Sequence, residues 1–280
     1  MNYKNIIGII REAKISACLV IRNEAKTIDR CLSSLQGVVD EIIVVHDGDC
    51  EDDSLNICRR HGAKIFVRPF FGAMEGHLPF AYRQCVGDWV LRVDGDEYLS
   101  PELKENLKNL TSNQDVSAYE FFWPLWDGTK TVTRNWPYKL CFFRKDKISF
   151  LGVVHFVTEV HGKISRSDLT LGHEPLVNNY TWKNFKKRWR QLAKIQAETY
   201  FKNISHVESF NYSKQDWSKK ILLRRSLSLL IAPFDFLIII FKTLKEGAYR
   251  NGIFAYKLAL MSGAYRVVVD YYIFKRKYWF

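Results

Sequence analysis

The feature that most restricts the fold of this chain is a regular alternation of short apolar runs and amphipathic segments between residues 12 and 110. Apolar runs of this length are typical of buried strands, and the amphipathic segments place apolar residues at helical spacing. Helices between strands provide the crossovers that parallel pairing requires, and they cover both faces of the sheet. We therefore expect an α/β fold with a mostly parallel sheet flanked by helices. The expected strands are Ile15–Ile21, Glu41–Val45, Lys64–Val67 and Trp89–Val93, and the expected helices are Ala25–Leu35, Ser54–His61 and one beginning at Ser100-Pro101.

The rest of the chain divides into two parts of different composition. Residues 111–181 are rich in aromatic residues and turns, and we expect strands at Leu140–Arg144 and Val153–Val160. From Trp182 onward, apolar residues recur at helical spacing and basic residues accumulate. We expect one domain over residues 1–181, with parts at about 12–110 and 111–181, and a helical, basic extension over residues 182–280.

Three carboxylates fall within four residues at Asp94-Gly95-Asp96-Glu97, directly after the fourth expected strand. Carboxylates at this spacing repel one another and need a compensating cation. Their oxygens suit Mg²⁺ or Mn²⁺, which also bind diphosphate oxygens and neutralise the charge on a departing nucleoside diphosphate. The alternative is an acidic loop that caps the helix beginning at Ser100.

Two other polar turns follow the first two expected strands. The segment His46–Asp53 contains Asp47 beside a glycine, and a carboxylate there can accept hydrogen bonds from a base or a ribose hydroxyl. Arg22-Asn23-Glu24 follows the first strand, where it either orients a nucleotide or begins the next helix. Ligands of such sheets bind beyond the carboxyl ends of the strands, so the three polar turns together predict a nucleotide pocket.

The order and spacing of these segments resemble the inverting family 2 glycosyltransferases over residues 15–110. The resemblance rests on Ile15–Leu35, Asp40–Asp53 and Gly87–Leu99. It implies a GT-A-like nucleotide-binding fold and a metal-dependent hexosyltransferase that uses a nucleotide-sugar donor, with a UDP-sugar favoured. Carried over by motif, it implies nucleotide-sugar contacts from Ile21, Asn23, Glu24, Asp47, Asp52 and Asp94, and contacts to Mg²⁺ or Mn²⁺ from Asp94 and Asp96.

Two features depart from the family pattern around the second motif. His46 stands where the family usually has an aspartate, and the motif is one residue longer here. The base-reading role implied by the resemblance therefore falls to Asp47, and the choice of donor stays open.

A weaker resemblance links residues 140–252 to lipopolysaccharide inner-core β-glucosyltransferases. That branch often has Val-His-Glu where this chain has Val154-His155-Phe156, so the general base must lie elsewhere. An inverting transfer needs one base near the acceptor hydroxyl. We identify His155 and Glu159 as catalytic candidates, with Asp127 as a third. For His155 the alternative is a role as ligand of the metal or the diphosphate, and the same alternatives apply to His173. For Glu159 the alternative is an exposed carboxylate on a strand without a catalytic role.

The last hundred residues hold the whole positive excess of the chain. Residues 182–280 carry 20 Lys and Arg against 6 Asp and Glu, a net charge of +14, whereas the whole chain carries +12. Within them, Ser226–Phe241 is apolar but interrupted by Pro233 and Asp235, and it is shorter than the roughly 20 residues of a spanning helix. Basic flanking residues favour a helix that lies in the headgroup layer of an anionic membrane, and a buried helix of the domain is the alternative.

Together these patterns predict sugar transfer to a saccharide or lipid-linked acceptor, for assembly of a cell-surface glycan or lipopolysaccharide. The alternatives are a polyprenyl-phosphate sugar synthase and a non-catalytic nucleotide or glycan binder. We expect no nucleic-acid partner, because the cations are interleaved with aliphatic runs and no nucleic-acid-binding motif is evident. The six cysteines lack C-x-x-C spacing and the N-terminus lacks a long apolar core, so we expect a cytoplasmic protein, peripheral on the inner face of the plasma membrane.

Overall fold

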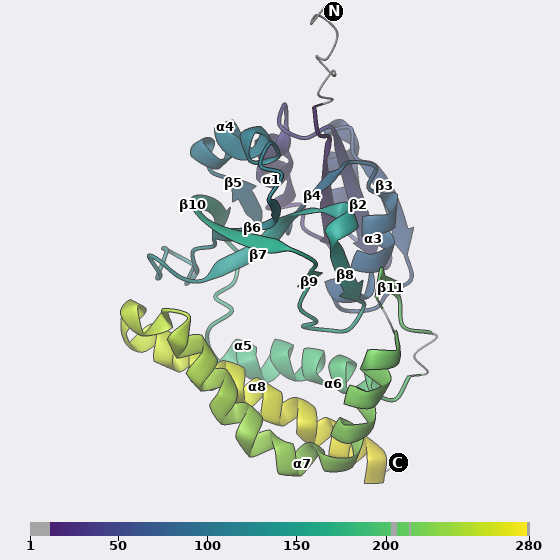
Figure 1. Cartoon of the computed structure of the whole chain (residues 1–280), viewed down its shortest axis with the longest axis vertical. Helices are drawn as coiled ribbons and strands as arrows, with labels where there is room; N and C mark the ends of the chain where they lie inside the picture. Colours follow the sequence, from purple (N-terminus) through teal and green to yellow (C-terminus); the bar gives the residue numbers. More distant parts are fainter. Residues whose placement is uncertain (1–11, 203–205, 213, 279–280) are drawn as a thin grey trace, which may run out of the picture.

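The computed structural model describes residues 12–202, 206–212 and 214–278, and for 214–220 it describes the backbone alone. Its centre is an eight-stranded sheet with helices on both faces, which confirms the expected α/β fold (Figure 1). The strands are β1 (Ile15–Ile21), β2 (Glu41–Asp47), β3 (Lys64–Arg68), β4 (Trp89–Arg92), β5 (Glu97–Leu99), β6 (Val116–Phe122), β7 (Tyr138–Arg144) and β10 (Lys163–His173).

The order of these strands is β3-β2-β1-β4-β7-β6-β10-β5. The first four are parallel, as the helical crossovers between them require. β7 pairs antiparallel with both β4 and β6, whereas β6 and β10 are parallel again. Four parallel pairs against three antiparallel ones therefore make a mixed sheet in which parallel pairing predominates.

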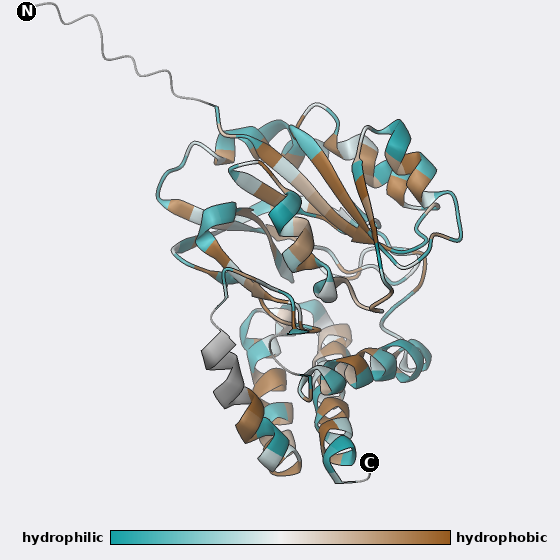
Figure 2. Cartoon of the chain, turned by 90° about the vertical axis from the view of Figure 1, so that its right-hand side faces the viewer, coloured by the Kyte–Doolittle hydropathy of each residue, from teal (hydrophilic) through white to brown (hydrophobic). Residues whose placement is uncertain are grey.

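Each face of the sheet has its own apolar core, visible as brown strands in Figure 2. On one face lie α1 (Ile28–Leu35), α2 (Ser54–Arg60) and α4 (Pro101–Leu110), which begins with the expected Ser100 cap on the backbone N–H of Leu103. The other face is covered by α3 (Leu78–Gln84) and by a small sheet of β8 (Ile148–Leu151), β9 (Glu159–Val160) and β11 (Ser209–Phe210).

The helices after residue 181 lie across the carboxyl end of the large sheet (Figure 1). A continuous helical run is formed by α5 (Trp182–Asn184), a π-helical turn (Phe185–Trp189) and α6 (Arg190–Thr199), as predicted from Trp182 onward. It packs on a helical hairpin of α7 (Lys214–Lys245) and α8 (Gly252–Tyr278), joined by a 3-10 turn at Ala248–Asn251. These helices therefore form a wall beyond the strand ends.

Two local predictions are wrong. The expected strand Val153–Val160 is a turn up to Thr158, with His155 in a left-handed conformation (φ 58°), and only Glu159–Val160 is extended. Helix α7 is not interrupted at Pro233, and its kink lies at Leu227.

Asp235 does not interrupt α7 because its charge is matched by neighbours. Its carboxylate pairs with Arg224 and, at 3.3 Å, with Arg266 of α8. Arg224 also pairs at 2.8 Å with Asp270 of α8, a carboxylate with no exposed area. This cluster of opposite charges joins the two helices of the hairpin.

Two helices of the described chain, Ile221–Lys245 and Ala248–Tyr278, are long and apolar enough to cross a membrane by length and composition alone. The apolar stretch of α7 is thus longer than the segment Ser226–Phe241 predicted from the sequence. Only 11% of the most apolar window of the first helix is buried inside the protein, against 39% for the second. Helix α7 therefore presents most of its apolar side chains to the surroundings.

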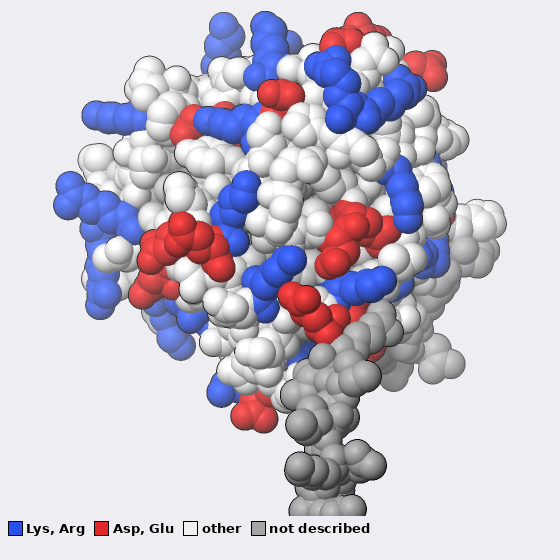
Figure 3. All heavy atoms as spheres, turned by 90° about the horizontal axis from the view of Figure 1, so that it is seen from above, with Lys and Arg blue, Asp and Glu red and all other residues white. Residues whose placement is uncertain are grey.

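Charges on the opposite end of the molecule are distributed differently. Viewed from above in the orientation of Figure 1, lysines and arginines are interspersed with aspartates and glutamates over this face (Figure 3). The cationic excess of the sequence instead belongs to the region of the C-terminal helices.

Candidate active site

A cavity of about 780 Å³ lies between the carboxyl ends of the strands and the C-terminal helices. All three polar turns predicted from the sequence contribute to its wall, and so do α6, α7 and α8. Of the predicted site residues, those that line it are Ile21, Glu24, Asp47, Asp94, Asp96, His155 and His173.

The carboxylates after β4 are held around one lysine. Lys139 of β7 places its Nζ 2.9 Å from Asp94 Oδ2 and 2.6 Å from Glu97 Oε1. Glu97 is fully buried and also accepts a hydrogen bond from the indole N–H of Trp123 at 2.5 Å. Burial alone would raise the pKa of Asp94, but the positive charges of Lys139 and then Arg92 outweigh it and lower that pKa. Lys139 thus supplies compensating positive charge to the acidic turn.

Asp96 lacks such a partner. Burial, and then the charge of Asp94, raise its pKa to about 6. Its Oδ2 lies 3.7 Å from Nε2 of His173, whose ring stacks on Trp123 at 4.1 Å. Burial, and then the charge of Lys139, lower the pKa of His173 to about 4, so the imidazole is neutral near pH 7 and does not neutralise Asp96.

Glu24 reaches the same turn from the end of β1. A Cβ atom on Gly95 would lie 1.7 Å from Glu24 Oε2, so any other residue at position 95 would displace the Glu24 carboxylate from its present place. That oxygen is buried and has no hydrogen-bond partner among the described residues. Burial, and then the charges of Asp96 and Asp94, raise the pKa of Glu24 to about 8. The cavity therefore gathers negative charge that protein groups only partly neutralise.

The donor set fits a magnesium or manganese ion held jointly with a diphosphate. No group of three or more His, Cys, Asp or Glu side chains in the described ranges is arranged to hold a metal by itself. However, Mg²⁺ in nucleotide sites is usually held by one or two carboxylates and completed by phosphate oxygens and water. Asp94 Oδ1 is buried without a hydrogen-bond partner, and Asp96 lines the cavity beside it.

Asp47 lines the cavity, but hydrogen bonds from the chain already occupy both of its carboxylate oxygens. It accepts from the backbone N–H groups of Phe71 (2.6 Å) and Gly72 (2.9 Å) and contacts His77 Nε2 at 2.8 Å. Burial would raise its pKa, and these hydrogen bonds, led by His77, lower it instead. Asp47 therefore fixes the segment after β3 as part of the cavity wall.

His46, Asn23 and Asp52 tie the first two polar turns together without lining the cavity. The buried His46 ring contacts the Gly48 carbonyl through Nδ1 at 2.8 Å and the Asn23 backbone N–H through Nε2 at 3.3 Å. The Asn23 side-chain oxygen accepts from the Glu51 backbone N–H at 2.9 Å. Asp52 is exposed and accepts from the Ala25 backbone N–H at 3.0 Å. These bonds keep the two turns in a fixed relation.

The catalytic candidates lie in different places. His155 lines the cavity, where its ring packs against Tyr265 of α8 at 4.7 Å and its backbone N–H donates to Glu75 at 2.9 Å. Surrounding protein atoms lower the pKa of His155 and outweigh the opposing charge of Glu75. Glu159 is exposed on β9 and Asp127 is half-buried in a turn with Thr129, and neither of them lines the cavity.

Several residues of the site were not predicted from the sequence. Lys139 contacts the acidic turn without lining the cavity, and it lies in an apolar strand, where a lone lysine is a signal of a buried cation. Glu75, Arg188 and Tyr180 carry no local signal, because their position depends on how distant segments pack.

Comparison with known proteins places the chain in a family. The family model described as "Glycosyl transferase family 2" matches residues 16–168. An uncharacterized glycosyltransferase of Rickettsia felis is 40% identical over 106 residues, which cover 38% of this chain and 37% of that protein. A lipopolysaccharide core biosynthesis glycosyltransferase of Rhizobium meliloti is 26% identical over 110 residues, covering 38% of this chain and 40% of that protein. The matches thus span well under half the length of these curated relatives.

Solved structures show a distant likeness. Mannosyl-3-phosphoglycerate synthase from Rubrobacter xylanophilus has 16% sequence identity and a TM-score of 0.46, over 67% of this chain and 74% of that one. Glucosyl-3-phosphoglycerate synthase from Mycobacterium tuberculosis, in complex with Mn²⁺, UDP and glucosyl-3-phosphoglycerate, has 16% identity and a TM-score of 0.45, over 66% and 79%.

Proposed function

Because the chain belongs to glycosyl transferase family 2, we propose that it transfers a hexose from a UDP-sugar to a saccharide or lipid-linked acceptor, with inversion at the anomeric carbon. The observation that supports this most directly is the meeting of three polar turns in one cavity at the carboxyl end of the sheet. That edge is where α/β sheets bind nucleotides. The acceptor enters from the side of the C-terminal helices, which form the opposite wall.

In this proposal the turn after β1 and the wall fixed by Asp47 hold the nucleoside, with Ile21 and Glu24 lining that part of the cavity. Asn23 and Asp52 act by fixing the turns. Asp94 and Asp96 would hold Mg²⁺ or Mn²⁺, which supplies positive charge to the departing diphosphate. Lys139 keeps the acidic turn compact when no other cation is bound.

We propose His155 rather than Glu159 as the group that accepts the proton of the acceptor hydroxyl. His155 lines the cavity and its lowered pKa keeps it neutral near pH 7, as a proton acceptor must be. Glu159 is exposed outside the cavity. His173 stands next to Asp96, so its neutral ring orients that carboxylate.

We further propose that the C-terminal hairpin associates with an anionic membrane surface. Phe234, Leu237 and Phe241 of α7 are each more than 60% exposed. Apolar surface beside Lys and Arg side chains binds to anionic headgroups. This places the enzyme at the inner face of the plasma membrane, with a role in glycan or lipopolysaccharide assembly.

The test is UDP release from a panel of UDP-sugars by the full chain in mild detergent, with Mn²⁺ or with chelator. Asp96→Asn should lower the metal-dependent rate by about a hundredfold or more, the scale seen when one group that stabilises transition-state charge is lost. Asp146→Asn is the matched control, because that carboxylate is 73% exposed and lies outside the cavity. Equal rates for wild type and Asp96→Asn would overturn the proposal.

A further inference from the structure

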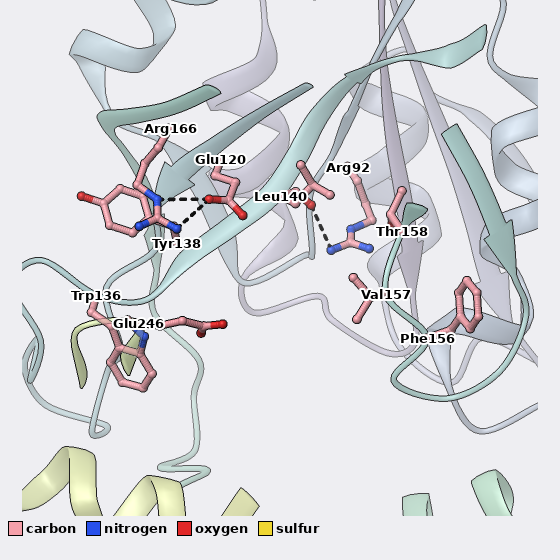
Figure 4. A pocket seen from close by; sticks show the side chains of 10 residues that line it. All are labelled: Arg92, Glu120, Trp136, Tyr138, Leu140, Phe156, Val157, Thr158, Arg166 and Glu246. Atoms are coloured by element: carbon pink, nitrogen blue, oxygen red, sulfur yellow. Dashed lines mark hydrogen bonds and ion pairs between the residues drawn. The ribbon is translucent and has the colours of Figure 1, made fainter. Parts of the chain in front are cut away.

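A second cavity, of about 380 Å³, lies against the strands β4, β7, β6 and β10 (Figure 4). Its floor consists of side chains from these neighbouring strands, and its roof comes from the turn after β8, from Trp136 and from the end of α7. The lining residues are Arg92, Glu120, Trp136, Tyr138, Leu140, Phe156, Val157, Thr158, Arg166 and Glu246.

One end of this cavity carries the guanidinium of Arg92, whose hydrogen-bond donors the described residues leave largely unused. The Nε of Arg92 is buried without a hydrogen-bond partner in the described part of the chain, and Nη2 makes only a long 3.4 Å contact to the Leu140 carbonyl. Arg92 forms no ion pair with a described carboxylate. A buried guanidinium without a partner is costly, and it is the side chain best suited to bind carboxylate or phosphate oxygens.

A second unsatisfied group lies at the same end. The Thr158 side chain is 7% exposed and its Oγ1 has no hydrogen-bond partner among the described residues. Thr158 and Arg92 line the same cavity, and Figure 4 draws both at its right-hand end. A hydroxyl next to an arginine offers two kinds of donor to a single anionic group.

The other arginine of the cavity shows what a satisfied partner looks like. Arg166 donates to Glu120 through Nε (3.1 Å) and Nη2 (2.9 Å), and its guanidinium covers the ring of Tyr138 at 4.4 Å. In Figure 4 this paired group lies at the opposite end from Arg92. The unpaired charge is thus confined to one end of the cavity, and polar groups suited to sugar hydroxyls lie at the other.

The small cavity adjoins the larger one that holds the acidic turn. Trp136 lines both. Pro137 and His155 line the larger cavity, while the residues that follow them in the chain, Tyr138 and Phe156, line the smaller. A ligand with more than one sugar ring can therefore occupy both.

We propose that the smaller cavity is an acceptor subsite for a sugar unit that carries an anionic group, a carboxylate or a phosphate, bound by Arg92 and Thr158. This assignment rests on the proposed function, since it takes the ligand to be the acceptor. The anionic unit occupies the subsite while a neighbouring sugar presents its hydroxyl to the larger cavity. The paired Arg166 and Glu120 then contact neutral hydroxyls.

The test is direct binding, without donor or turnover. Glucuronic acid, glucose 6-phosphate and uncharged glucose are titrated into the full chain in mild detergent, and dissociation constants are measured by NMR. The wild type should bind at least one of the two acids more tightly than glucose, and the preferred acid identifies the anion as carboxylate or phosphate. Arg92→Met should weaken that binding by about tenfold or more, as expected for the loss of charge-assisted hydrogen bonds.

Two further variants keep the result interpretable. Thr158→Val keeps the shape of the side chain and removes the hydroxyl, so it should weaken acid binding by a few-fold even where Arg92→Met fails to fold. Arg59→Met removes an exposed arginine of α2 outside the cavity, and it should leave binding unchanged. The thermal midpoint of Arg92→Met is measured alongside, because the Arg92 charge also lowers the pKa of Asp94 and its loss can affect folding.

Three outcomes would overturn the subsite. The first is that wild type and Arg92→Met bind the preferred acid with equal affinity. The second is that the wild type binds glucose as tightly as both acids. The third is that no probe binds at all, which would mean that water alone fills the cavity. Asp96→Asn separates this inference from the proposed function, because that variant should retain acid binding. If no UDP-sugar is turned over but acid binding depends on Arg92, the cavity binds an anionic sugar, and its role as an acceptor subsite fails together with the proposed transfer.

Discussion

Replacing Lys139 with methionine would test the electrostatics of the acidic turn most directly. Methionine is close to lysine in length, so the substitution removes the charge and little volume. In the wild type, Lys139 Nζ lies 2.9 Å from Asp94 and 2.6 Å from the fully buried Glu97. The variant leaves Asp94, Asp96 and Glu97 without the cation that contacts two of them, and only the more distant charge of Arg92 remains.

The expected cost is about 3–5 kcal/mol at pH 8, the range for breaking a buried ion pair by removing one partner. The cost should shrink as the pH falls. In the variant, the pKa values of Asp94, Asp96 and Glu97 all rise, because Lys139 lowers each of them in the wild type. The folded variant therefore binds more protons than the folded wild type. Deprotonation of these carboxyl groups as pH rises therefore costs the variant more stability than the wild type, and the difference between the two proteins is larger at pH 8 than at pH 5.

The assay is urea unfolding of wild type and Lys139→Met at pH 5 and pH 8, in mild detergent and with chelator. Lys147→Met is the control, since Lys147 is 48% exposed and its 3.9 Å pair with Asp146 should contribute less than about 1 kcal/mol. Adding Mn²⁺ with UDP at pH 8 should recover more stability in Lys139→Met than in the wild type. A variant as stable as the wild type at pH 8 would refute the role of Lys139 as the compensating charge.

Two other predictions concern the base and the membrane surface. His155→Asn should lower kcat by about 10²- to 10⁴-fold with little change in donor KM, whereas Glu159→Gln should not, and stopped assays over a pH series measure both; the wild-type rate should already be on its plateau at pH 7, because the pKa of His155 is lowered, and a larger loss in Glu159→Gln would reverse the assignment. Replacing Phe234 and Leu237 of α7 with aspartate should reduce sedimentation of the protein with anionic vesicles. Leu176→Asp, at an exposed site outside the hairpin, should not reduce it. Equal sedimentation of the wild type and both variants would refute membrane association through α7.

The sequence was most informative where neighbouring residues decide the structure. The strands β1, β2 and β4 are buried on both faces, so their residues form near-continuous apolar runs that are easily recognised. The polar turns after them follow from the geometry of parallel sheets, and three of them do line one cavity. Local signals of this kind also located the Ser100 cap.

The sequence failed where distant segments decide the structure. Lys139 reaches Asp94 only because β7 pairs antiparallel with β4, with Leu91 opposite Phe142. The segment Val153–Val160 has the composition of a strand, but Glu75, eighty residues away, holds the backbone N–H of His155 in a left-handed turn. No periodicity within either segment contains this information.

The position of the hairpin links the membrane surface to the two cavities. Helix α8 places Leu258 and Ser262 in the wall of the larger cavity, and the end of α7 places Glu246 in the wall of the smaller one. The same α7 exposes its apolar side chains outward, and the ion pairs of Arg224 with Asp270 and of Asp235 with Arg266 fix it to α8. A bilayer that contacts α7 therefore contacts an element of both cavity walls. In the proposed function, an acceptor anchored in that bilayer needs only to reach across the hairpin for its sugars to enter the two cavities.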